Sequence, residues 1–450
     1  MGKQATHVDR TLIVGLGKTG LSCARYLSRQ GVSLAVTDSR KNPPGREALQ
    51  QQFPDLALFV GGFQPEVFQA ADHLVVSPGI PLSEPLIQAA KTRGAEILGD
   101  IELFARAAGA PVVAITGSNG KSTVTTLLGE MARMAGIKVA VGGNLGEPAL
   151  DLLDDAVELY VLELSSFQLE STWSLQPAAA VVLNISADHM DRYAGIEDYA
   201  AVKATVYDRA QHAVINRDDP WGAVMGGKVA QTIGFTLAEP EGEDFGLLAH
   251  QGATWLAQGS TPLLAVDDLR IKGRHNLANA LAALALGSAL ALPMNAMLTA
   301  LRTFAGLPHR TQWVAEKQGL QWYNDSKGTN VGATIAALRG LHGDDDSRTL
   351  LIAGGECKGA DFTELASVAE ATTRAVILIG RDAPLLETAL QGGCRLAHAV
   401  SLEDAVSQAL KLGRPGDRVL LSPACASFDM FKNFEARGEA FVRAVEALPA

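Results

Sequence analysis

The chain has 450 residues, of which 47% are hydrophobic and 19% are charged, and these values are typical of a globular protein with about three domains. The formal net charge of −11 argues against a surface that binds nucleic acid. The four cysteines have no metal or disulfide spacing, no apolar stretch reaches the roughly 18 residues of a membrane-spanning helix, and the polar N-terminus does not resemble a signal peptide, so we expect a protein of the reducing cytoplasm.

The N-terminal part of the chain alternates short apolar strands with amphipathic helices. This alternation predicts a parallel β-sheet that is covered by helices on both faces. We expect strands at 12–15, 33–37 and 74–77, and helices at 19–30 and 85–93.

The first turn between a strand and a helix is rich in glycine. Residues 15–20, Gly-Leu-Gly-Lys-Thr-Gly, fit the dinucleotide-binding pattern G-x-G-x-x-G, and Asp38 ends the next strand about 20 residues further on. Alone, this pattern indicates an NAD-dependent oxidoreductase. Glycines at a helix N-terminus admit any phosphate, and a carboxylate can hold any ribose. A nucleotide-linked substrate therefore fits the turn as well as a redox cofactor does.

The most specific motif lies at 114–123, Ala-Ile-Thr-Gly-Ser-Asn-Gly-Lys-Ser-Thr. It follows an apolar strand and opens a helix that we expect to continue to Met134. Lys121 would reach the β- and γ-phosphates of ATP, and a hydroxyl of the following Ser-Thr pair would meet Mg²⁺. Gly117 and Gly120 are separated by two residues instead of the usual four, so a glycine-rich turn with a surface lysine remains the alternative.

Polar residues follow the next strands of this second α/β unit, which we expect at 138–141, 159–164 and 179–184. Glu163 is placed to hold Mg²⁺, and the alternative is a carboxylate exposed to water at a strand end. His189 lies between two aspartates and could bind a metal or a substrate carboxylate. Lys203 falls in a helical pattern at 197–208, which by itself predicts a solvent-exposed lysine.

A third set of strands, expected at 349–353, 375–379 and 418–422, follows the dipeptide Leu307-Pro308, which is typical of a linker. Loops at 324–330, 354–359 and 422–429 together predict a site for a small zwitterion or carboxylate. Boundaries near Gly99 and Gly306 give predicted domains at 1–99, 100–306 and 307–450. The predicted fold class is α/β, with a Rossmann-like N-terminal domain, a central P-loop ATPase-like domain with a mainly parallel sheet, and a Rossmann-like C-terminal domain.

Taken together, these motifs resemble those of the Mur ligases, ATP-dependent enzymes that build the peptide stem of peptidoglycan. The resemblance rests on 116–123, the strand that ends at Glu163, 184–193, 307–310 and 324–330, in this order along essentially the whole chain. Segments 162–170 and 422–438 are similar to the branch that adds D-glutamate, and the Asp-Asn-Pro-Arg-type motif of the diaminopimelate-adding branch does not occur in the sequence. The resemblance implies a cytoplasmic monomer that joins D-glutamate to UDP-N-acetylmuramoyl-L-alanine through an acyl phosphate, using ATP and Mg²⁺ and not NAD.

The resemblance reinterprets the glycine-rich turn as a site for a UDP-sugar. The residues that it assigns to the sugar nucleotide lie mostly in the first domain. They are Gly17, Lys18, Thr19 and Gly20 for the diphosphate, Asp38, Ser39 and Arg40 for the uridine end, Ser77 and Gly79 for the cleft, and Asn144 and His189 facing the substrate.

The resemblance also implies the sites for ATP, metal and amino acid. For ATP it implies Gly117, Ser118, Asn119, Gly120, Lys121, Ser122, Thr123, Asn276, Arg310, Asp325 and Lys327. For Mg²⁺ it implies Ser122, Glu163, His189 and a carbamate of Lys203, since a neutral amine can capture CO₂ and become an anion. For D-glutamate it implies Thr329, Lys358, Ser427 and Phe434, and its implied catalytic residues are Lys121, His189, Lys203 and Arg310.

Two other classes of function stay open from the sequence. An NAD-dependent oxidoreductase is supported by residues 15–20 alone and leaves the ATP motif and the third domain unexplained. A regulatory ATP-binding module without chemistry is the weaker alternative. Phosphate release that requires both other substrates would separate these classes from a ligase.

Overall fold

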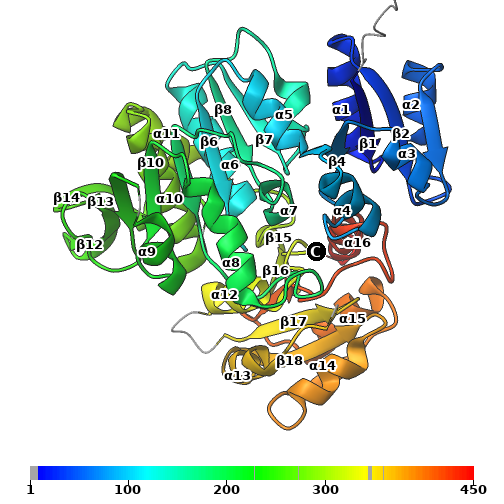
Figure 1. The fold of residues 1–450 in the computed structure, drawn as a ribbon. Coiled ribbons are helices and arrows are strands. Elements are labelled where there is room, and N and C mark those ends of the chain that lie inside the picture. Colours follow the sequence, from blue (N-terminus) through cyan, green and yellow to red (C-terminus); the bar gives the residue numbers. More distant parts are fainter. Residues whose placement is uncertain (1–8, 228, 272, 343–346, 358, 450) are drawn as a thin grey trace, which may run out of the picture.

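The structure is a computed structural model that describes residues 9–227, 229–271, 273–342, 347–357 and 359–449. Three α/β units follow one another along the chain, each built on its own sheet. Figure 1 shows the first unit in blue, the second in cyan to green and the third in yellow to red, with the second in contact with both others. The predicted α/β fold class with mostly parallel sheets is confirmed.

The first sheet is parallel throughout and has the strand order β3-β2-β1-β4-β5. Its central strands are apolar because helices cover them on both faces. The elements are β1 (Arg10–Val14), α1 (Lys18–Arg29), β2 (Ser33–Asp38), α2 (Arg46–Gln52), β3 (Ala57–Val60), α3 (Pro65–Gln69), β4 (His73–Val76), α4 (Pro85–Thr92) and β5 (Glu96–Leu98).

The second sheet has the order β14-β13-β12-β11-β10-β9-β6-β8-β7. It is parallel from β7 to β12, and the arm β12-β13-β14 is antiparallel. The sequence analysis predicted the strands that form β6 to β9, and it did not predict β10, β11 or the antiparallel arm. The elements are α5 (Asp100–Ala107), β6 (Val112–Thr116), α6 (Lys121–Met134), β7 (Val139–Gly143), η1 (Ala149–Leu152), β8 (Leu159–Glu163), α7 (Ser166–Leu169), β9 (Ala179–Val182), α8 (Ile196–Ala204), η2 (Thr205–Tyr207), β10 (His212–Asn216), α9 (Pro220–Gly226), β11 (Gln231–Phe235), β12 (Phe245–His250), β13 (Ala253–Gln258), β14 (Thr261–Ala265), η3 (Val266–Asp268), α10 (Arg274–Ala289) and α11 (Met294–Thr303).

The third sheet has the order β15-β16-β20-β17-β18-β19 and is parallel except for the pair β15 and β16. Strands β17 and β20 are neighbours although about 65 residues separate them, so the loops that follow them meet at one edge of the sheet. The elements are β15 (Gln312–Lys317), β16 (Leu320–Asn324), α12 (Val331–Leu341), β17 (Thr349–Gly354), α13 (Thr363–Thr372), β18 (Thr373–Ile379), α14 (Ala383–Leu390), β19 (Leu396–His398), α15 (Leu402–Leu412), β20 (Arg418–Leu421) and α16 (Phe434–Glu446).

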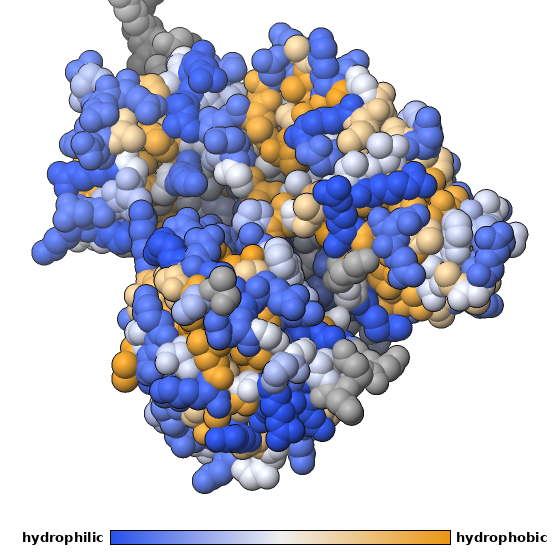
Figure 2. All heavy atoms as spheres, turned by 180° about the vertical axis from the view of Figure 1, so that it is seen from behind, coloured by the Kyte–Doolittle hydropathy of each residue, from blue (hydrophilic) through white to orange (hydrophobic). Residues whose placement is uncertain are grey.

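Side chains from different units meet between the sheets. Arg25 on α1 forms an ion pair with Asp151 on η1, and Arg310 donates to the hydroxyl of Ser122 at 2.7 Å. Figure 2 shows that the surface is hollowed where the first unit meets the other two, with hydrophilic side chains around the hollow. In the described residues, no helix is both long and apolar enough to cross a membrane.

Candidate active site

The glycine-rich turn between β1 and α1 is tight. Gly15 has a φ of +96°, and its carbonyl accepts a hydrogen bond from the Ser77 hydroxyl at 2.9 Å. A Cβ at Gly20 would lie 2.0 Å from the Gly15 carbonyl oxygen, so a side chain at this position would push the helix away from the turn. The N-terminus of α1 is thereby held at a cavity, as phosphate binding requires.

Asp38 at the end of β2 forms hydrogen bonds with the glycine-rich turn and with Arg40. Its carboxylate accepts from the Leu16 N–H at 2.7 Å and from the Arg40 guanidinium at 2.7 and 2.9 Å. Burial alone would raise the pKa of Asp38, but the hydrogen bonds from Arg40 and Leu16 outweigh burial and lower it. Asp38 is therefore an anion with its oxygens already engaged, and Ser39 and Arg40, not Asp38, line the cavity.

The phosphate loop joins β6 to α6. Gly117 and Gly120 have φ values of +144° and +85°, which favour glycine. Lys121 Nζ lies back over the loop and donates to the carbonyls of Gly117 and Ser118 at 2.8 Å each. Burial lowers the pKa of Lys121. These interactions keep the ammonium at the loop and leave it available to an incoming phosphate.

Glu163, at the end of β8, receives hydrogen bonds from two neighbouring elements. The Ser122 hydroxyl donates to Oε2 at 2.6 Å, and the Asn144 amide donates to Oε1 at 2.7 Å. Burial alone would raise the pKa of Glu163, but the positive charge of Lys121, these hydrogen bonds and Arg310 outweigh it, so the pKa is lowered. The end of β8 thus carries a buried anion beside the phosphate loop.

These groups fit Mg²⁺ held together with phosphates. Mg²⁺ commonly takes one or two protein oxygens and completes its shell with water and phosphate. Glu163 and the Ser122 hydroxyl are such oxygens, 2.6 Å apart at one edge of the sheet. The described residues hold no cluster of three or more His, Cys, Asp or Glu side chains that would bind a metal without phosphate.

Lys203 is not the exposed lysine that its helical pattern predicts. Its side chain on α8 is 1% exposed, its Nζ donates to the Thr116 hydroxyl at 3.2 Å, and it lies 4.6 Å from the ring centroid of Tyr199. Burial, together with the charge of Lys121, lowers the pKa of Lys203 well below its usual value. Lys203 is four residues after Tyr199, so both lie on one face of the helix. That face is buried, with Lys203 at Thr116 and the Tyr199 hydroxyl at that of Ser118, which the helical pattern does not reveal.

His189 lies in the loop after β9 with a φ of +58°. Its ring packs 4.7 Å from the ring of Phe167, and its Nε2 lies 3.8 Å from the Asp188 carboxylate. Arg192, in the same loop, donates to the Pro78 carbonyl of the first unit at 3.0 Å and pairs with Glu170. The loop that carries His189 is therefore fixed against the unit that carries the glycine-rich turn.

A second cavity lies between α10 and α12 and brings together the second and third units. Asn276 lines it from α10, and Asp325 and Lys327 line it from the loop after β16. Burial raises the pKa of Asp325 to about 6, while burial and the nearby Arg310 lower the pKa of Lys327 to about 8. Residues predicted for ATP from both units thus share one cavity, namely Asn119, Gly120, Thr123, Asn276, Arg310, Asp325 and Lys327.

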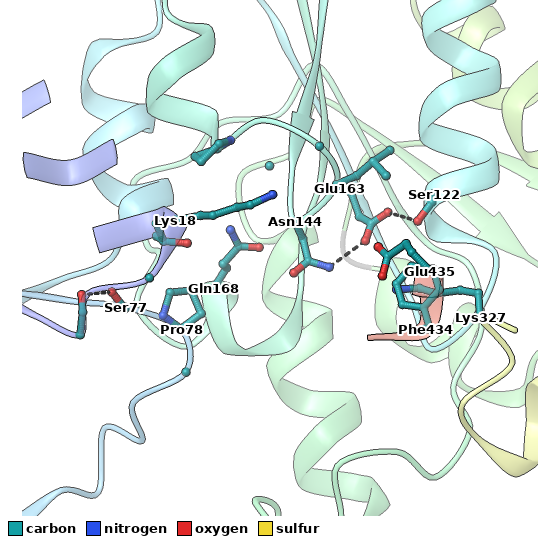
Figure 3. Close-up of a pocket in the computed structure, with 18 of the residues that line it drawn as sticks. Lys18, Ser77, Pro78, Ser122, Asn144, Glu163, Gln168, Lys327, Phe434 and Glu435 are labelled. Atoms are coloured by element: carbon teal, nitrogen blue, oxygen red, sulfur yellow. Dashed lines mark hydrogen bonds between the residues drawn. The ribbon is translucent and has the colours of Figure 1, made fainter. Parts of the chain in front are cut away.

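The remaining predicted ATP and sugar residues lie around two adjoining cavities. A cavity of about 940 Å³ runs from the glycine-rich turn to Glu163 (Figure 3) and is lined by Gly17, Lys18, Thr19, Ser39, Arg40, Ser77, Gly79, Ser122, Asn144, Glu163, Arg310 and Lys327. The other shares Asn144, Glu163, Arg310 and Lys327 with it and adds Ser118, Asn119, Gly120, Lys121 and His189. Gly20, Asp38, Gly117 and Lys203 support these walls without lining them.

Of the four residues predicted for D-glutamate, the three that the structure describes do not line one cavity. Thr329 faces the cavity of Lys121 and His189, Phe434 lines the cavity of the glycine-rich turn, and Ser427 is buried at 3% exposure. Lys358 lies outside the described residues. The structure brings loop residues Glu356 and Ala426 to the cavity of Thr329 instead.

Several cavity residues were missed by the sequence analysis. Gln168 lines the cavity at the glycine-rich turn and donates to the Asp100 carboxylate at 3.0 Å. Asn279 lines the cavity between α10 and α12. Asn279 is three residues after Asn276 on α10 and so lies on the same face of that helix. The remaining contacts depend on how the units pack, which the sequence pattern does not specify.

A phosphate loop with a carboxylate beside it, flanked by a second phosphate-binding turn and a third α/β unit, defines a class of nucleotide-dependent enzymes with three domains. Comparison with known families narrows the class. The models "Mur ligase MurD-like, N-terminal domain", "Mur ligase middle domain" and "Mur ligase, glutamate ligase domain" match residues 9–99, 115–287 and 309–425. The chain belongs to the Mur ligase family, as its resemblance predicted.

Two curated relatives match nearly the whole chain. A protein of Nitrosococcus oceani is 54% identical over 439 residues, covering 97% of this chain and 96% of the relative, and one of Pseudomonas aeruginosa is 52% identical over 440 residues, covering 97% and 98%. Both are named UDP-N-acetylmuramoylalanine–D-glutamate ligase. Among solved structures, the UDP-N-acetylmuramate-alanine ligase of Thermotoga maritima matches with a TM-score of 0.62 at 16% identity, covering 98% of this chain and 100% of that chain, which shows the shared fold.

Proposed function

We propose that this protein is an ATP-dependent ligase that joins D-glutamate to UDP-N-acetylmuramoyl-L-alanine and releases ADP and phosphate. The observation that carries the proposal is the continuous cavity that runs from the glycine-rich turn of the first unit to Ser122 and Glu163 at the phosphate loop (Figure 3). A sugar nucleotide bound along it would have its diphosphate at the turn and its carboxylate near the γ-phosphate of ATP. The relatives that cover almost the whole chain bear the name of this activity.

The reaction begins when the alanine carboxylate of the sugar nucleotide attacks the γ-phosphate of ATP and displaces ADP. Negative charge then accumulates on the transferring phosphoryl group, and catalysis of such a step is mainly positioning and charge stabilisation. Lys121 and Arg310 are two cations at the phosphate loop. Arg310 comes from the third unit and donates to Ser122 of the second, so it reaches the phosphates only when the two units are together.

The acyl phosphate is then attacked by the amine of D-glutamate, and phosphate leaves from the tetrahedral intermediate. We place D-glutamate in the cavity that Thr329 shares with Lys121 and His189. Lys358, Ser427 and Phe434 remain predicted partners of the amino acid. His189 faces the same cavity and is our candidate for the group that takes a proton from the ammonium. The domain limits 1–99, 100–306 and 307–450 and a monomer in the cytoplasm belong to this proposal.

Ser122 and Glu163 would hold Mg²⁺ with the phosphates of ATP, and the ion would supply positive charge at the phosphoryl group. His189 and Lys203 complete the predicted metal set. Burial lowers the pKa of Lys203 and so favours its neutral amine, the form that can take up CO₂. As a carbamate, Lys203 would add an anion beneath the phosphate loop, where the ammonium would repel a cation.

A phosphate-release assay tests the proposal. The full-length protein with ATP and Mg²⁺ should release phosphate rapidly only when UDP-N-acetylmuramoyl-L-alanine and D-glutamate are both present, because the acyl phosphate needs both an acid and an amine. L-Glutamate serves as the matched control for the amine. Release without the sugar nucleotide at the full rate would contradict the proposal.

Ligand titration separates the ligase from an NAD-dependent oxidoreductase. The sugar nucleotide should bind the full-length protein in calorimetry, and NAD should not, because the cavity beyond the turn leads to a phosphate loop and not to a hydride acceptor. Lys18, which lines the cavity at the turn, provides the variant: Lys18→Ala should weaken sugar-nucleotide binding and leave ATP binding unchanged. Tight NAD binding would favour the oxidoreductase.

A further inference from the structure

Two cysteine side chains meet in the third unit, apart from the residues assigned above. The Sγ atoms of Cys357 and Cys425 are 2.8 Å apart, and the two residues are 4% and 1% exposed. Both thiols are free. Their spacing in the sequence gives no sign of this contact, which arises because β17 and β20 are adjacent strands.

The backbone around the two cysteines has the register of an antiparallel pair. Glu356 and Ala426 form an isolated antiparallel bridge and exchange both hydrogen bonds, at 3.0 and 2.9 Å. The next opposed pair, Cys357 and Cys425, is therefore a non-hydrogen-bonded pair, in which Cα atoms lie about 4.5 Å apart. That separation falls within the range of about 4.4–6.8 Å that a disulfide spans.

The backbone of each cysteine is also held by a hydrogen bond to a side chain. The Cys357 N–H donates to the Asp382 carboxylate at 2.9 Å, and the Cys425 carbonyl accepts from the buried guanidinium of Arg437 at 3.1 Å. The two sulfurs thus face each other across fixed backbone, and an S–S bond of about 2.05 Å requires only about 0.8 Å of approach.

We propose that Cys357 and Cys425 are a redox modification site that is oxidised to an intramolecular disulfide by a small disulfide such as oxidised glutathione. Cys357 lines the open cavity that we assign to D-glutamate, together with Glu356 and Ala426, so it is the sulfur that an oxidant in solution meets first. Cys425 is covered, and it is the resolving thiol. Only Cys357 of the buried pair lines the cavity, so a reductant or oxidant reaches the pair from this one side.

The chemistry balances with one oxidant molecule. The thiolate of Cys357 attacks one sulfur of the small disulfide, forms a mixed disulfide and releases one thiol. Cys425 then loses its proton and attacks the Cys357 sulfur, which forms the intramolecular bond and releases the second thiol. The two cysteines lose two electrons and two protons, and the small disulfide gains them. Excess reduced thiol reverses both steps, as regulation in a reducing compartment requires.

Oxidation would affect the reaction through the cavity. The bond would add a covalent link to the hydrogen bonds that already join the two loops at Glu356 and Ala426, and it would draw the two sulfurs about 0.8 Å closer at the wall of the cavity. Misplacement by about 1 Å in an active site can lower the rate by up to about 10²-fold. This part of the inference rests on the proposed function, since it takes the cavity as the site for D-glutamate.

Thiol mapping of the full-length wild-type protein tests the modification without any assay of activity. The protein is incubated in mixtures of reduced and oxidised glutathione, quenched with acid, alkylated in denaturant, digested and analysed by mass spectrometry. We expect a peptide pair linked through Cys357 and Cys425 that disappears with excess dithiothreitol. Alkylation of both residues in every mixture, while the more accessible Cys394 carries glutathione, would overturn the proposal.

Cysteine variants and enzyme kinetics test which thiols form the cross-link and whether it affects the use of D-glutamate. Cys394→Ser is the matched control and should keep the cross-link and the wild-type activity. Cys425→Ser should form only mixed disulfides with glutathione. The melting temperature of Cys425→Ser checks that this variant folds. In the wild type, oxidation should lower kcat/KM for D-glutamate by about tenfold, leave KM for ATP unchanged and be reversed by dithiothreitol. The rate of Cys357→Ser should be the same before and after oxidation. A cross-link without this kinetic effect would refute the placement of D-glutamate and leave the modification site standing.

Discussion

At the scale of single residues, burial decides what the charged groups of the site can do. Lys203 has no carboxylate within hydrogen-bonding distance among its described contacts and lies under the phosphate loop. Such a position is unfavourable for an ammonium. It becomes favourable when the amine carries a negative charge and a cation lies nearby, which is the condition that ATP with Mg²⁺ would create.

The first prediction follows for Lys203. Lys203→Met keeps most of the buried volume and removes the amine, so we expect phosphate release to fall by about 10²-fold or more with a melting temperature close to that of the wild type. Lys203→Ala should lose activity as well, and acetate should restore part of it by placing a carboxylate in the vacated space. Because the side chain is buried, the alanine variant should also melt at a lower temperature.

Lys91→Ala is the control for Lys203, since Lys91 is exposed on α4. It should be indistinguishable from the wild type in rate and in stability. Arginine at position 203 should not restore activity, because a guanidinium keeps its proton and cannot take up CO₂. Full turnover of Lys203→Ala without acetate would show that the lysine is only structural.

The second prediction concerns Glu163, whose carboxylate is charged because Lys121, Ser122 and Asn144 stabilise it. Glu163→Gln keeps the shape and removes the charge, so the apparent affinity for Mg²⁺ in phosphate release should fall by at least about tenfold. Excess Mg²⁺ should recover part of the rate. Glu158→Gln, just before the same strand and exposed, should leave the Mg²⁺ dependence unchanged, and an unchanged dependence for Glu163→Gln would argue that the metal lies elsewhere.

At the scale of elements, the buried carboxyl of the first residue of α5 lowers the stability of the folded protein when it is ionised. Asp100 is buried, is bonded to Gln168 of α7 at 3.0 Å, and burial raises its pKa to about 6. The folded state therefore binds a proton more tightly than the unfolded chain, and this contribution makes the protein less stable as the pH rises from about 4 to about 6.

The third prediction is that Asp100→Asn is more stable than the wild type at pH 7.5. The raised pKa corresponds to at most about 3 kcal/mol, and the amide oxygen can still accept from Gln168. The difference in melting temperature between variant and wild type should shrink as the pH falls from about 6 to about 4, and it should be smallest below about pH 3, where the wild-type carboxyl is protonated in both states. Asp155→Asn, at an exposed position, should show no such pH-dependent difference. If Asp100→Asn is less stable than the wild type at every pH, ionised Asp100 does not destabilise the folded state.

The parallel strands were predictable from the sequence because they are buried on both faces and so form continuous apolar runs, as at β6 and β17. The arm β12-β13-β14 was not predicted, although the sequence holds a glycine at the turn between its first two strands. Gln251 and Gly252, with φ values of +51° and +79°, form the two-residue turn that is typical of a hairpin. The order of strands was not predictable, and it is the order that brings Cys357 to Cys425 and buries Lys203.

At the scale of the whole molecule, the site exists only where the units meet. The second and third units are joined beside the cavity between α10 and α12. Arg310 donates to Ser122. The amide of Asn330 donates to Asn119 at 3.3 Å and to the Asp188 carboxylate at 3.4 Å. ATP would add its phosphates between these polar contacts. An acyl phosphate needs such a closed site because water hydrolyses it.

The fourth prediction is that ATP and the sugar nucleotide together stabilise the contact between these units, and that Asn330→Asp weakens it. The aspartate still caps α12, as the Asn330 side chain does for the Ala333 N–H, but it places a carboxylate against that of Asp188. We expect KM for ATP to rise several-fold, the radius of gyration in small-angle X-ray scattering to increase, and the melting temperature of the variant to change little. Asn295→Asp makes the same charge change at the start of α11, far from the contact, and should leave all three quantities unchanged. If Asn330→Asp binds ATP normally and scatters as the wild type does, the polar contacts of Asn330 do not hold the units together.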